Sequence, residues 1–321
     1  MQEFLRFPLR RKRRCESLHR LDCVHYSSQQ HFKSMSRILT ILLFLLSLKC
    51  LAYVEIHEGQ FVNNGKPWTA IGVNLLSEKC DKHIFRSVAD YGWNSVRVVF
   101  ASNEQLRQSV KSANRAGVKL YVVVEKDCDI SSLTPFQKVQ AIWAWECSNL
   151  EQAEKLDELF PHHLIALTMH PSDDESRIDR AVISQCIDFL SLKLLPFDYK
   201  WVSANNLRLG LKNCYLQSQQ LIDKFMTRMQ TTVKPIVISE CSYPRDKMFR
   251  LPMSSTSSRD SYFNFVINYK HPVFGRSLGG VFFQQWELPP KEDKEKHVTS
   301  FSIYPSDLST QDLIIKAVSY K

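Results

Sequence analysis

Glu240 is the residue of this sequence that most directly suggests chemistry. It follows the apolar run Pro235–Ser239, which is typical of a buried strand. A carboxylate at such a strand end can act as a nucleophile or exchange a proton with a bound molecule. It can also form a structural ion pair, and Arg97 is a possible partner because an arginine within an apolar strand needs a counter-charge.

The elements that must position these side chains are short apolar runs that alternate with longer amphipathic stretches. This pattern predicts βαβ units with a mainly parallel sheet. Strands are predicted over Thr69–Asn74, Ser95–Phe100, Val118–Glu125, Leu164–Met169, Lys200–Ala204, Leu207–Lys212, Pro235–Ser239 and Gly279–Gln284. Helices are predicted over Asp81–Tyr91, Asn103–Ala116, Thr134–Leu159, Asp174–Leu194, Gln217–Thr231 and Ser258–Tyr269. We therefore expect a single-domain α/β fold, a (β/α)8 TIM barrel preceded by a short N-terminal hairpin.

Active sites of such barrels lie at the C-terminal ends of the strands. The residues expected at those ends are Asn74, Arg97, Glu125, Asp127, His170, Asn205, Asn206, Asn213, Tyr215, Glu240 and Trp286.

Four segments of the sequence resemble glycoside hydrolase family 5, the family of cellulases and mannanases. The segment 234-KPIVISECSYP-244 is similar to the seventh strand of that family, and 61-FVNNGKPWTAIGVNL-75 is similar to its entry hairpin and first strand. The segment 91-YGWNSVRVVF-100 resembles its second strand, and 279-GGVFFQQWEL-288 resembles its last. The resemblance extends from Phe61 to about Leu288.

The resemblance implies retaining hydrolysis of O-glycosyl bonds in a β-linked glycan. In this family the seventh strand carries the nucleophile, which would be Glu240, and an arginine on the second strand supports it, which would be Arg97. Asn74 would bind substrate, and the aromatic residue after the last strand, here Trp286, would form a sugar platform.

Two positions depart from the family pattern. The fourth strand of the family normally ends in Asn-Glu-Pro, whose Glu is the general acid/base, whereas the predicted fourth strand here ends in Met169-His170-Pro171. The sixth normally ends in His-x-Tyr, and Asn213-Cys214-Tyr215 stands in that place. His170 thus becomes the candidate catalytic acid, since an imidazole with a pKa near 6.5 can donate a proton. Asn213 and Tyr215 become candidate substrate-binding residues.

Two functions are therefore weighed against each other, and a structural exported protein is the third alternative. The first is a glycosidase in which His170 replaces the second carboxyl group that retaining hydrolysis requires about 5–5.5 Å from the nucleophile. The second is a degenerate barrel that binds carbohydrate or protein without turnover. No cofactor and no metal are expected, because the cysteines show no metal-ligand spacing.

The N-terminal region differs in composition from the remainder. Residues 1–52 contain ten Lys/Arg and three Asp/Glu, so most of the net charge of +9 lies there. The remainder is nearly neutral, which argues against a nucleic-acid partner. The apolar run Ile38–Leu48 after Met35-Ser-Arg37 predicts a signal peptide over residues 35–52, too short for a membrane span. Cleavage after Ala52 would leave residues 53–321 as the exported barrel, secreted or periplasmic.

Residues 1–34 have no regular periodicity and are interpreted as an over-extended gene start or a disordered segment; a basic cytoplasmic tail is the alternative. Six cysteines follow Ala52, and an even number in an exported chain permits either disulfides or buried free thiols.

Overall fold

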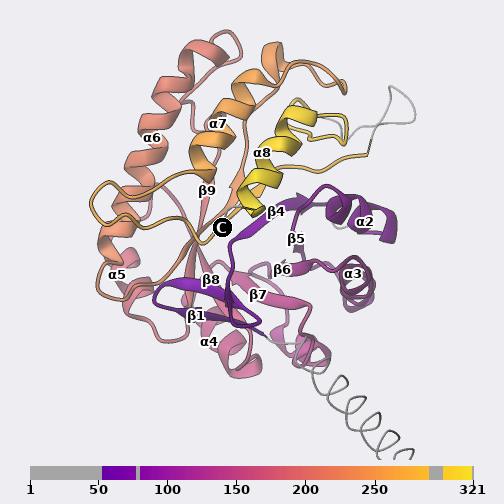
Figure 1. Cartoon of the computed structure of the whole chain (residues 1–321). Helices are drawn as coiled ribbons and strands as arrows, with labels where there is room; N and C mark the ends of the chain where they lie inside the picture. The colour runs from indigo at the N-terminus through magenta and orange to yellow at the C-terminus, as the bar shows by residue number, and fades with distance from the viewer. Residues whose placement is uncertain (1–52, 77–79, 289–298, 320–321) are drawn as a thin grey trace, which may run out of the picture. The chain divides into compact units, whose positions relative to one another are not determined.

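The computed structural model describes residues 53–76, 80–288 and 299–319 (Figure 1). The predicted N-terminal segment and signal peptide therefore lie outside the described residues. None of the helices within the described ranges has the length and apolar character that crossing a membrane requires.

The described chain forms a closed barrel of eight parallel strands, which confirms the predicted fold. In barrel order the strands are β4 (Ala70–Leu75), β5 (Ser95–Val99), β6 (Lys119–Val123), β7 (Ile142–Cys147), β8 (Leu164–Met169), β9 (Phe189–Leu194), β10 (Ile236–Cys241) and β11 (Gly280–Phe283). Strand β11 pairs with β4 and closes the barrel.

Helices surround this barrel on its outer side (Figure 1). They are α2 (Lys82–Asp90), α3 (Asn103–Ala116), α4 (Leu150–Leu159), α5 (Glu175–Ile183), α6 (Leu207–Arg228), α7 (Ser257–Ile267) and α8 (Leu308–Ser319), with short 3-10 helices η3 (Ile130–Phe136) and η4 (Asp246–Met248). The predicted bounds of the helix Asn103–Ala116 are confirmed in α3. Ser102 caps its first turn, and Gly117 ends it with a φ of 73°, a left-handed conformation that suits glycine.

The predicted helices over Thr134–Leu159 and Asp174–Leu194 are wrong in part, because each range contains a barrel strand. All six residues of β7 are buried, and a strand buried on both faces lacks the alternation that separates a strand from a buried helix. Trp143 packs in the barrel interior, whereas Trp145 packs between barrel and helices. The same reason applies to β9, in which five of six residues are buried.

The predicted strands over Lys200–Ala204 and Leu207–Lys212 are also wrong. The first is a loop, and the second is the beginning of α6. Burial along α6 follows a helical period, with Leu207, Gly210 and Cys214 buried while Leu209 is 86% exposed. The tertiary contacts thus select a helix at a segment whose apolar content alone suggested a strand.

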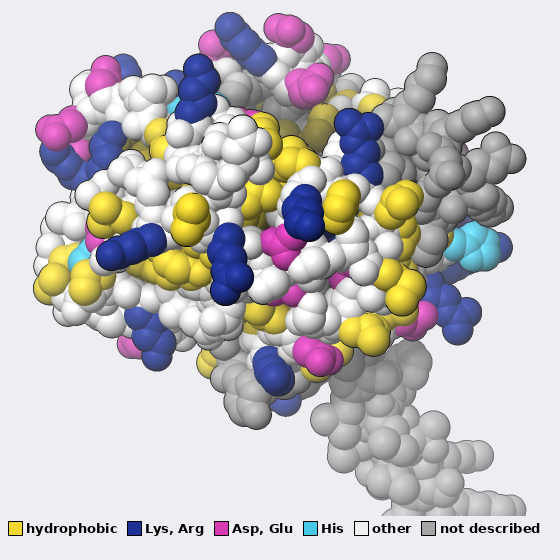
Figure 2. Space-filling model, turned by 90° about the horizontal axis from the view of Figure 1, so that it is seen from above, with side chains coloured by type: hydrophobic (Ala, Val, Ile, Leu, Met, Phe, Trp, Pro, Cys, Tyr) yellow, Lys and Arg dark blue, Asp and Glu magenta, His cyan; other side chains and the backbone are white. Residues whose placement is uncertain are grey.

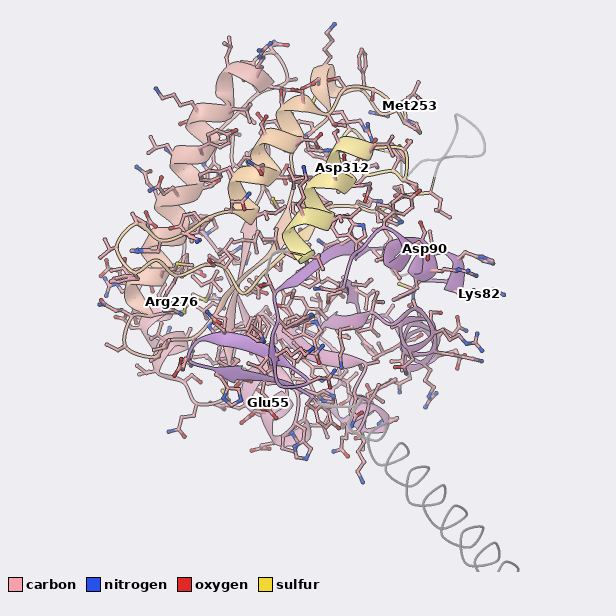
Figure 3. All side chains as sticks on the ribbon, viewed as in Figure 1. Glu55, Lys82, Asp90, Met253, Arg276 and Asp312 are labelled. Atoms are coloured by element: carbon pink, nitrogen blue, oxygen red, sulfur yellow. The ribbon has the colours of Figure 1, made fainter. Side chains whose placement is uncertain are left out.

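A hairpin covers the N-terminal end of the barrel, as predicted. It consists of β1 (Val54–His57), β2 (Gln60–Asn63) and the short β3 (Lys66–Pro67). Phe61 is fully buried, with its ring 5.2 Å from those of both Trp143 and Phe189. In Figure 3, Glu55 of the hairpin and Met253 of the loop after β10 lie at opposite ends of the barrel.

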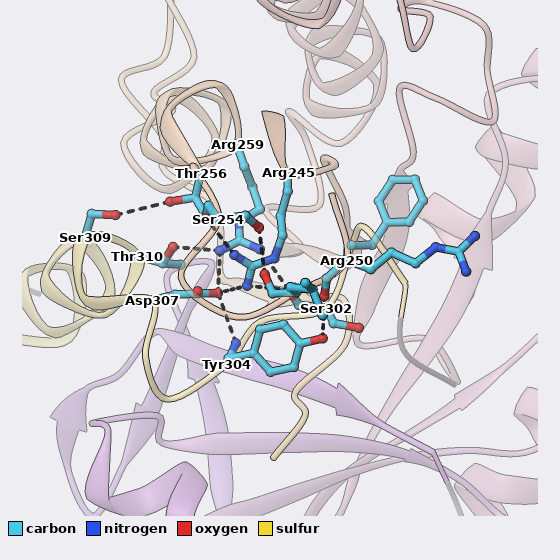
Figure 4. A network of polar contacts seen from close by, with 12 residues as sticks. Arg245, Arg250, Ser254, Thr256, Arg259, Ser302, Tyr304, Asp307, Ser309 and Thr310 are labelled. Atoms are coloured by element: carbon cyan, nitrogen blue, oxygen red, sulfur yellow. Dashed lines mark hydrogen bonds and ion pairs between the residues drawn. The ribbon is translucent and has the colours of Figure 1, made fainter. Parts of the chain in front are cut away.

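A buried ionic cluster fixes the loops that follow β10 and β11 (Figure 4). Arg245 and Arg259 both donate to the Oδ2 atom of Asp307, the latter at 2.8 Å. Both also donate to the backbone carbonyl of Ser302. Because these charges are fully desolvated, loss of one partner would leave an uncompensated buried charge. The cluster therefore ties the segment before α8 to the loop before α7.

On the face shown in Figure 2, Lys and Arg side chains are scattered singly among hydrophobic and acidic ones.

Phe61→Ala should destabilise the protein by about 3–5 kcal/mol, because it opens a cavity at the base of the barrel. Urea unfolding at neutral pH measures the effect. Phe249→Ala is the control, since Phe249 is 50% exposed and its truncation should change the free energy of unfolding by at most about 0.5 kcal/mol. Equal effects of the two substitutions would contradict the role assigned to Phe61.

Candidate functional site

Arg97 is the centre of a polar network at the C-terminal end of the barrel. Its Nε and Nη2 atoms donate to Glu146 at 2.7 and 3.0 Å. Its Nη1 atom donates to Asn74 at 2.8 Å and to Glu240 at 3.3 Å. Strand register explains part of the arrangement, because Asn74 and Arg97 are Cα partners on β4 and β5. The network joins three residues predicted for the site with Glu146, which was not predicted.

Glu146 is a buried anion rather than an acid. Its side chain is 1% exposed. Besides Arg97, the hydroxyl of Thr168 donates a hydrogen bond to it at 2.7 Å. Burial by itself raises the pKa of this carboxyl group, but the charge and hydrogen bonds of Arg97 outweigh burial and lower the pKa to about 2. Glu146 is therefore ionised at neutral pH and holds no proton that it could donate.

Lys193 forms an ion pair with the predicted nucleophile. The two residues are Cα partners on the neighbouring strands β9 and β10, and Lys193 Nζ lies 2.6 Å from Glu240 Oε1. The same oxygen atom accepts from Arg97. The Lys193 and Glu240 side chains are 27% and 19% exposed, so solvent reaches this ion pair. Two cations thus share one carboxylate oxygen.

The fourth barrel strand is β7, so the segment compared with the family's Asn-Glu-Pro must be corrected. β7 ends at Cys147, and Ser148 is followed by Asn149-Leu150-Glu151. Asn149 matches the family's Asn, and Leu150 stands where the acid/base Glu is expected. Leu150 packs against the hydrophobic core.

The two residues that flank Leu150 belong to the start of α4. Asn149 is the N-cap, and its side chain accepts from the backbone of Gln152 at 2.9 Å. Glu151 lies in the first turn, where its 77% exposed carboxylate pairs with Lys155. Neither side chain joins the Arg97 network.

The sixth barrel strand is β9, which moves the second departure as well. Lys193-Leu194-Leu195 now stands in place of His-x-Tyr, so Lys193 occupies the His position and Leu195 the Tyr position. Asn213 and Tyr215 lie instead on α6. Asn213 is exposed and donates to the carbonyl of Trp201 at 2.7 Å, and Tyr215 stacks on Phe265 with ring centroids 4.7 Å apart.

The remaining predicted residues are dispersed. His170 follows the fifth strand rather than the fourth; it is exposed, and its backbone donates to Asp173 within the same turn. Trp286 is 1% exposed and packs against Tyr91 and Trp93, so it offers no ring face to a ligand. Glu125 and Asp127 are exposed, as is Asn205, while Asn206 is the residue before α6.

The residues that the sequence analysis missed carried a recognisable signal. Glu146 and Lys193 are single charges inside apolar runs, as Arg97 is, and each such charge needs a partner when the run is buried. Because both runs were predicted as helices, Glu146 and Lys193 were not expected at strand ends. Among the described residues, no group of three His, Cys, Asp or Glu side chains could hold a metal ion, and all six described cysteines are free.

Glu146→Gln should destabilise the protein by about 3–5 kcal/mol at neutral pH, because it leaves Arg97 without its main counter-charge. The folded pKa of about 2 lies below the unfolded value, so this stabilisation is present above about pH 4.5 and is lost as the pH falls towards 2. Urea unfolding between pH 7 and pH 3 should show the difference between variant and wild type shrinking below about pH 4.5. Exposed Glu151→Gln is the control, and a pH-independent difference for Glu146→Gln would contradict the assignment.

Comparisons with known proteins find similarity to one family model and to several solved barrel structures. The family model described as "GH family 5 beta-mannosidase-like" matches residues 134–287, a range that contains β7, β9 and β10. A comparison with curated protein sequences gives no match.

Solved structures resemble the whole barrel. The glycoside hydrolase family 5 mannosidase from Rhizomucor miehei is 16% identical, with a TM-score of 0.69 over 84% of this chain and 97% of that chain. A mutant of that mannosidase in complex with mannosyl-fructose gives a TM-score of 0.65 at 15% identity, over 84% and 99% of the two chains. A β-glucuronidase from an uncultured Clostridium species gives 0.59 at 13% identity, over 84% of this chain and 53% of that one. The chain thus shares the (β/α)8 barrel fold of these structures, and over residues 134–287 it is similar to the β-mannosidase-like branch of glycoside hydrolase family 5.

Proposed function

We propose that this protein binds an uncharged carbohydrate at the C-terminal end of its barrel and does not hydrolyse it by the retaining mechanism. The observation that carries the proposal is the pairing of Glu240 with Lys193 while Leu150 occupies the acid/base position. The first of these changes restrains the nucleophile, and the second removes the proton donor.

The missing proton donor is the stronger argument. Cleavage of an unactivated glycosidic bond needs a carboxylic acid that protonates the leaving oxygen. Within the described residues the network contains one carboxylate besides Glu240, that of Glu146. Because Glu146 is buried and its pKa is about 2, it is neither in reach of a ligand nor protonated at neutral pH. A useful general acid has a pKa near the working pH.

The state of Glu240 adds a second barrier. Attack on an anomeric carbon uses an electron pair of the carboxylate. The charge of Lys193, added to that of the supporting Arg97, stabilises this carboxylate before any reaction. Covalent bond formation would reduce this favourable interaction. The site therefore stabilises the unreacted state of Glu240, which is the reverse of what catalysis requires.

Binding does not need either group to react. Lys193 and Glu240 are both partly exposed, and they supply a donor and an acceptor for sugar hydroxyls. The mannosidase that this barrel resembles has been seen with mannosyl-fructose. β-Mannose-containing oligosaccharides are therefore the first ligands to test.

The decisive measurement compares turnover with binding. Wild-type protein, Glu240→Gln and the double variant Leu150→Glu/Lys193→His are incubated with aryl β-mannosides and aryl β-glucosides. We expect no Glu240-dependent release of aryl alcohol from the wild type. The double variant, which restores a carboxyl group and removes the competing cation, should gain release by about 10²-fold or more, as expected for a general acid.

Release by the wild type that Glu240→Gln abolishes would overturn the proposal in favour of a hydrolase with a non-standard acid. A folded double variant without activity would show that more than these two positions prevent hydrolysis. Binding is followed in parallel by calorimetric titration with β-manno-oligosaccharides. A wild type that neither binds nor hydrolyses any sugar of the panel would contradict a carbohydrate role.

We also propose that the barrel is exported after cleavage behind Ala52. Support comes from the signal-like residues 35–52. The first residue after that point, Tyr53, is seated with its ring 5.4 Å from His162 and 5.2 Å from His163. Expression of the full chain in a secreting host, followed by N-terminal sequencing of the medium protein, should give Tyr53. Retention in the cell with residues 35–52 intact would contradict export.

A further inference from the structure

We propose that the loop between β9 and α6 provides the aromatic surface for the sugar, formed by Tyr199 and Trp201 beside the Lys193–Glu240 ion pair, and that it takes a neutral pyranose. This inference rests on the proposed carbohydrate-binding function and specifies where and what the site binds.

The loop begins directly after the strand that carries Lys193. Its sequence 197-FDYKW-201 places aromatic residues at alternate positions. Three backbone hydrogen bonds fold it compactly, from Tyr199 to Leu195 at 3.0 Å, from Lys200 to Phe197 at 3.1 Å and from Trp201 to Pro196 at 2.9 Å. The aromatic side chains are thus held in a fixed turn rather than on a loose segment.

Tyr199 connects this loop to the ion pair. Its hydroxyl donates to the backbone carbonyl of Lys193 at 3.3 Å. Burial, followed by the negative charge of Glu240, raises the pKa of Tyr199 to about 12, which agrees with a position near that carboxylate. Tyr199 therefore remains a neutral donor at physiological pH.

Trp201 is the second partly exposed aromatic residue of this loop. The rings of Tyr199 and Trp201 lie 5.0 Å apart at an interplanar angle of 56°, and both side chains are partly exposed. The carbonyl of Trp201 accepts from Asn213 of α6 at 2.7 Å. Asn213 was predicted from the sequence to bind substrate. In the structure its side chain holds this loop against α6. Trp286, which resembles the family's platform residue, is buried and leaves that role to other aromatic side chains.

The chemistry of the surface matches a pyranose ring. Small-ligand sites combine aromatic lining with a few polar groups that fix orientation. A sugar presents C–H groups that pack on an aromatic face and hydroxyl groups that need donors and acceptors. Tyr199 and Trp201 supply the first kind of contact, and Lys193 and Glu240 supply the second.

Charge balance selects a neutral sugar over an acidic one. The network holds two cations, Arg97 and Lys193, and two anions, Glu146 and Glu240. An anionic ligand would meet no net positive charge, and it would have to displace Glu240 from Lys193. The same ion pair that restrains the nucleophile therefore disfavours uronic acids relative to neutral sugars.

The test is calorimetric titration of residues 53–321 with β-mannotriose and with an oligosaccharide that ends in glucuronic acid. Trp201→Ala should weaken binding of the neutral sugar tenfold or more, as expected for an aromatic anchor that a bound ligand covers. Trp201→Phe, which keeps a ring, should retain most of the affinity. Phe274→Ala is the matched control, because Phe274 is a partly buried loop aromatic that stacks on His271 in the connection between α7 and β11. Thermal melting of each variant verifies that the barrel is folded.

The possible outcomes test the aromatic platform, the neutral ligand class and the proposed function separately. Unchanged binding by folded Trp201→Ala would overturn the platform and leave the carbohydrate-binding function standing. Equal losses in Trp201→Ala and Phe274→Ala would overturn it as well, because the effect would then not be local. Stronger binding of the glucuronic acid ligand would overturn the neutral class. A wild type that binds neither sugar would overturn both the platform and the proposed function.

Discussion

The charge of Arg97 is the constraint on which the C-terminal end of the barrel depends. A guanidinium group within a closed barrel is stable only when its donors are paired and its charge is compensated. Glu146 supplies the compensation through two hydrogen bonds, while Asn74 and Glu240 accept from the remaining nitrogen atom. The positions of four side chains on four strands follow from this one requirement.

The same requirement explains why the network can persist without catalysis. Arg97 and Glu146 are almost fully buried, so their removal would be expected to destabilise the fold whether or not the protein turns over a substrate. Lys193 and Leu150 lie at the partly exposed margin, where a change of residue alters chemistry more than stability. A buried ion pair that stabilises the barrel can therefore be combined with different chemistry at the margin of the site, which is the general relation between a fold and the functions built on it.

Loop aromatics then become more important than strand ends for recognition. Trp286 is absorbed into the packing against Tyr91 and Trp93, and the ionic cluster of Arg245, Arg259 and Asp307 fixes the segment that follows it. The loop after β9 lies on the side of Lys193 and presents partly exposed rings. In this protein, packing decides which aromatic side chain a ligand can reach.

The sequence by itself determined the barrel class, the hairpin at its base, and the juxtaposition of Asn74, Arg97 and Glu240. These followed from strands with clear boundaries, such as Gly92 before β5 and Lys234-Pro235 before β10, and from a charge that had to be paired. Only the tertiary structure decided that Ile142–Cys147 and Phe189–Leu194 are strands, because a run buried on both faces has the same local pattern in a strand and in a buried helix. That decision changed the site, since it replaced His170 by Leu150 at the acid position and set Lys193 in register with Glu240. Cross-strand neighbours depend on strand order and register, and neither is encoded within a single segment.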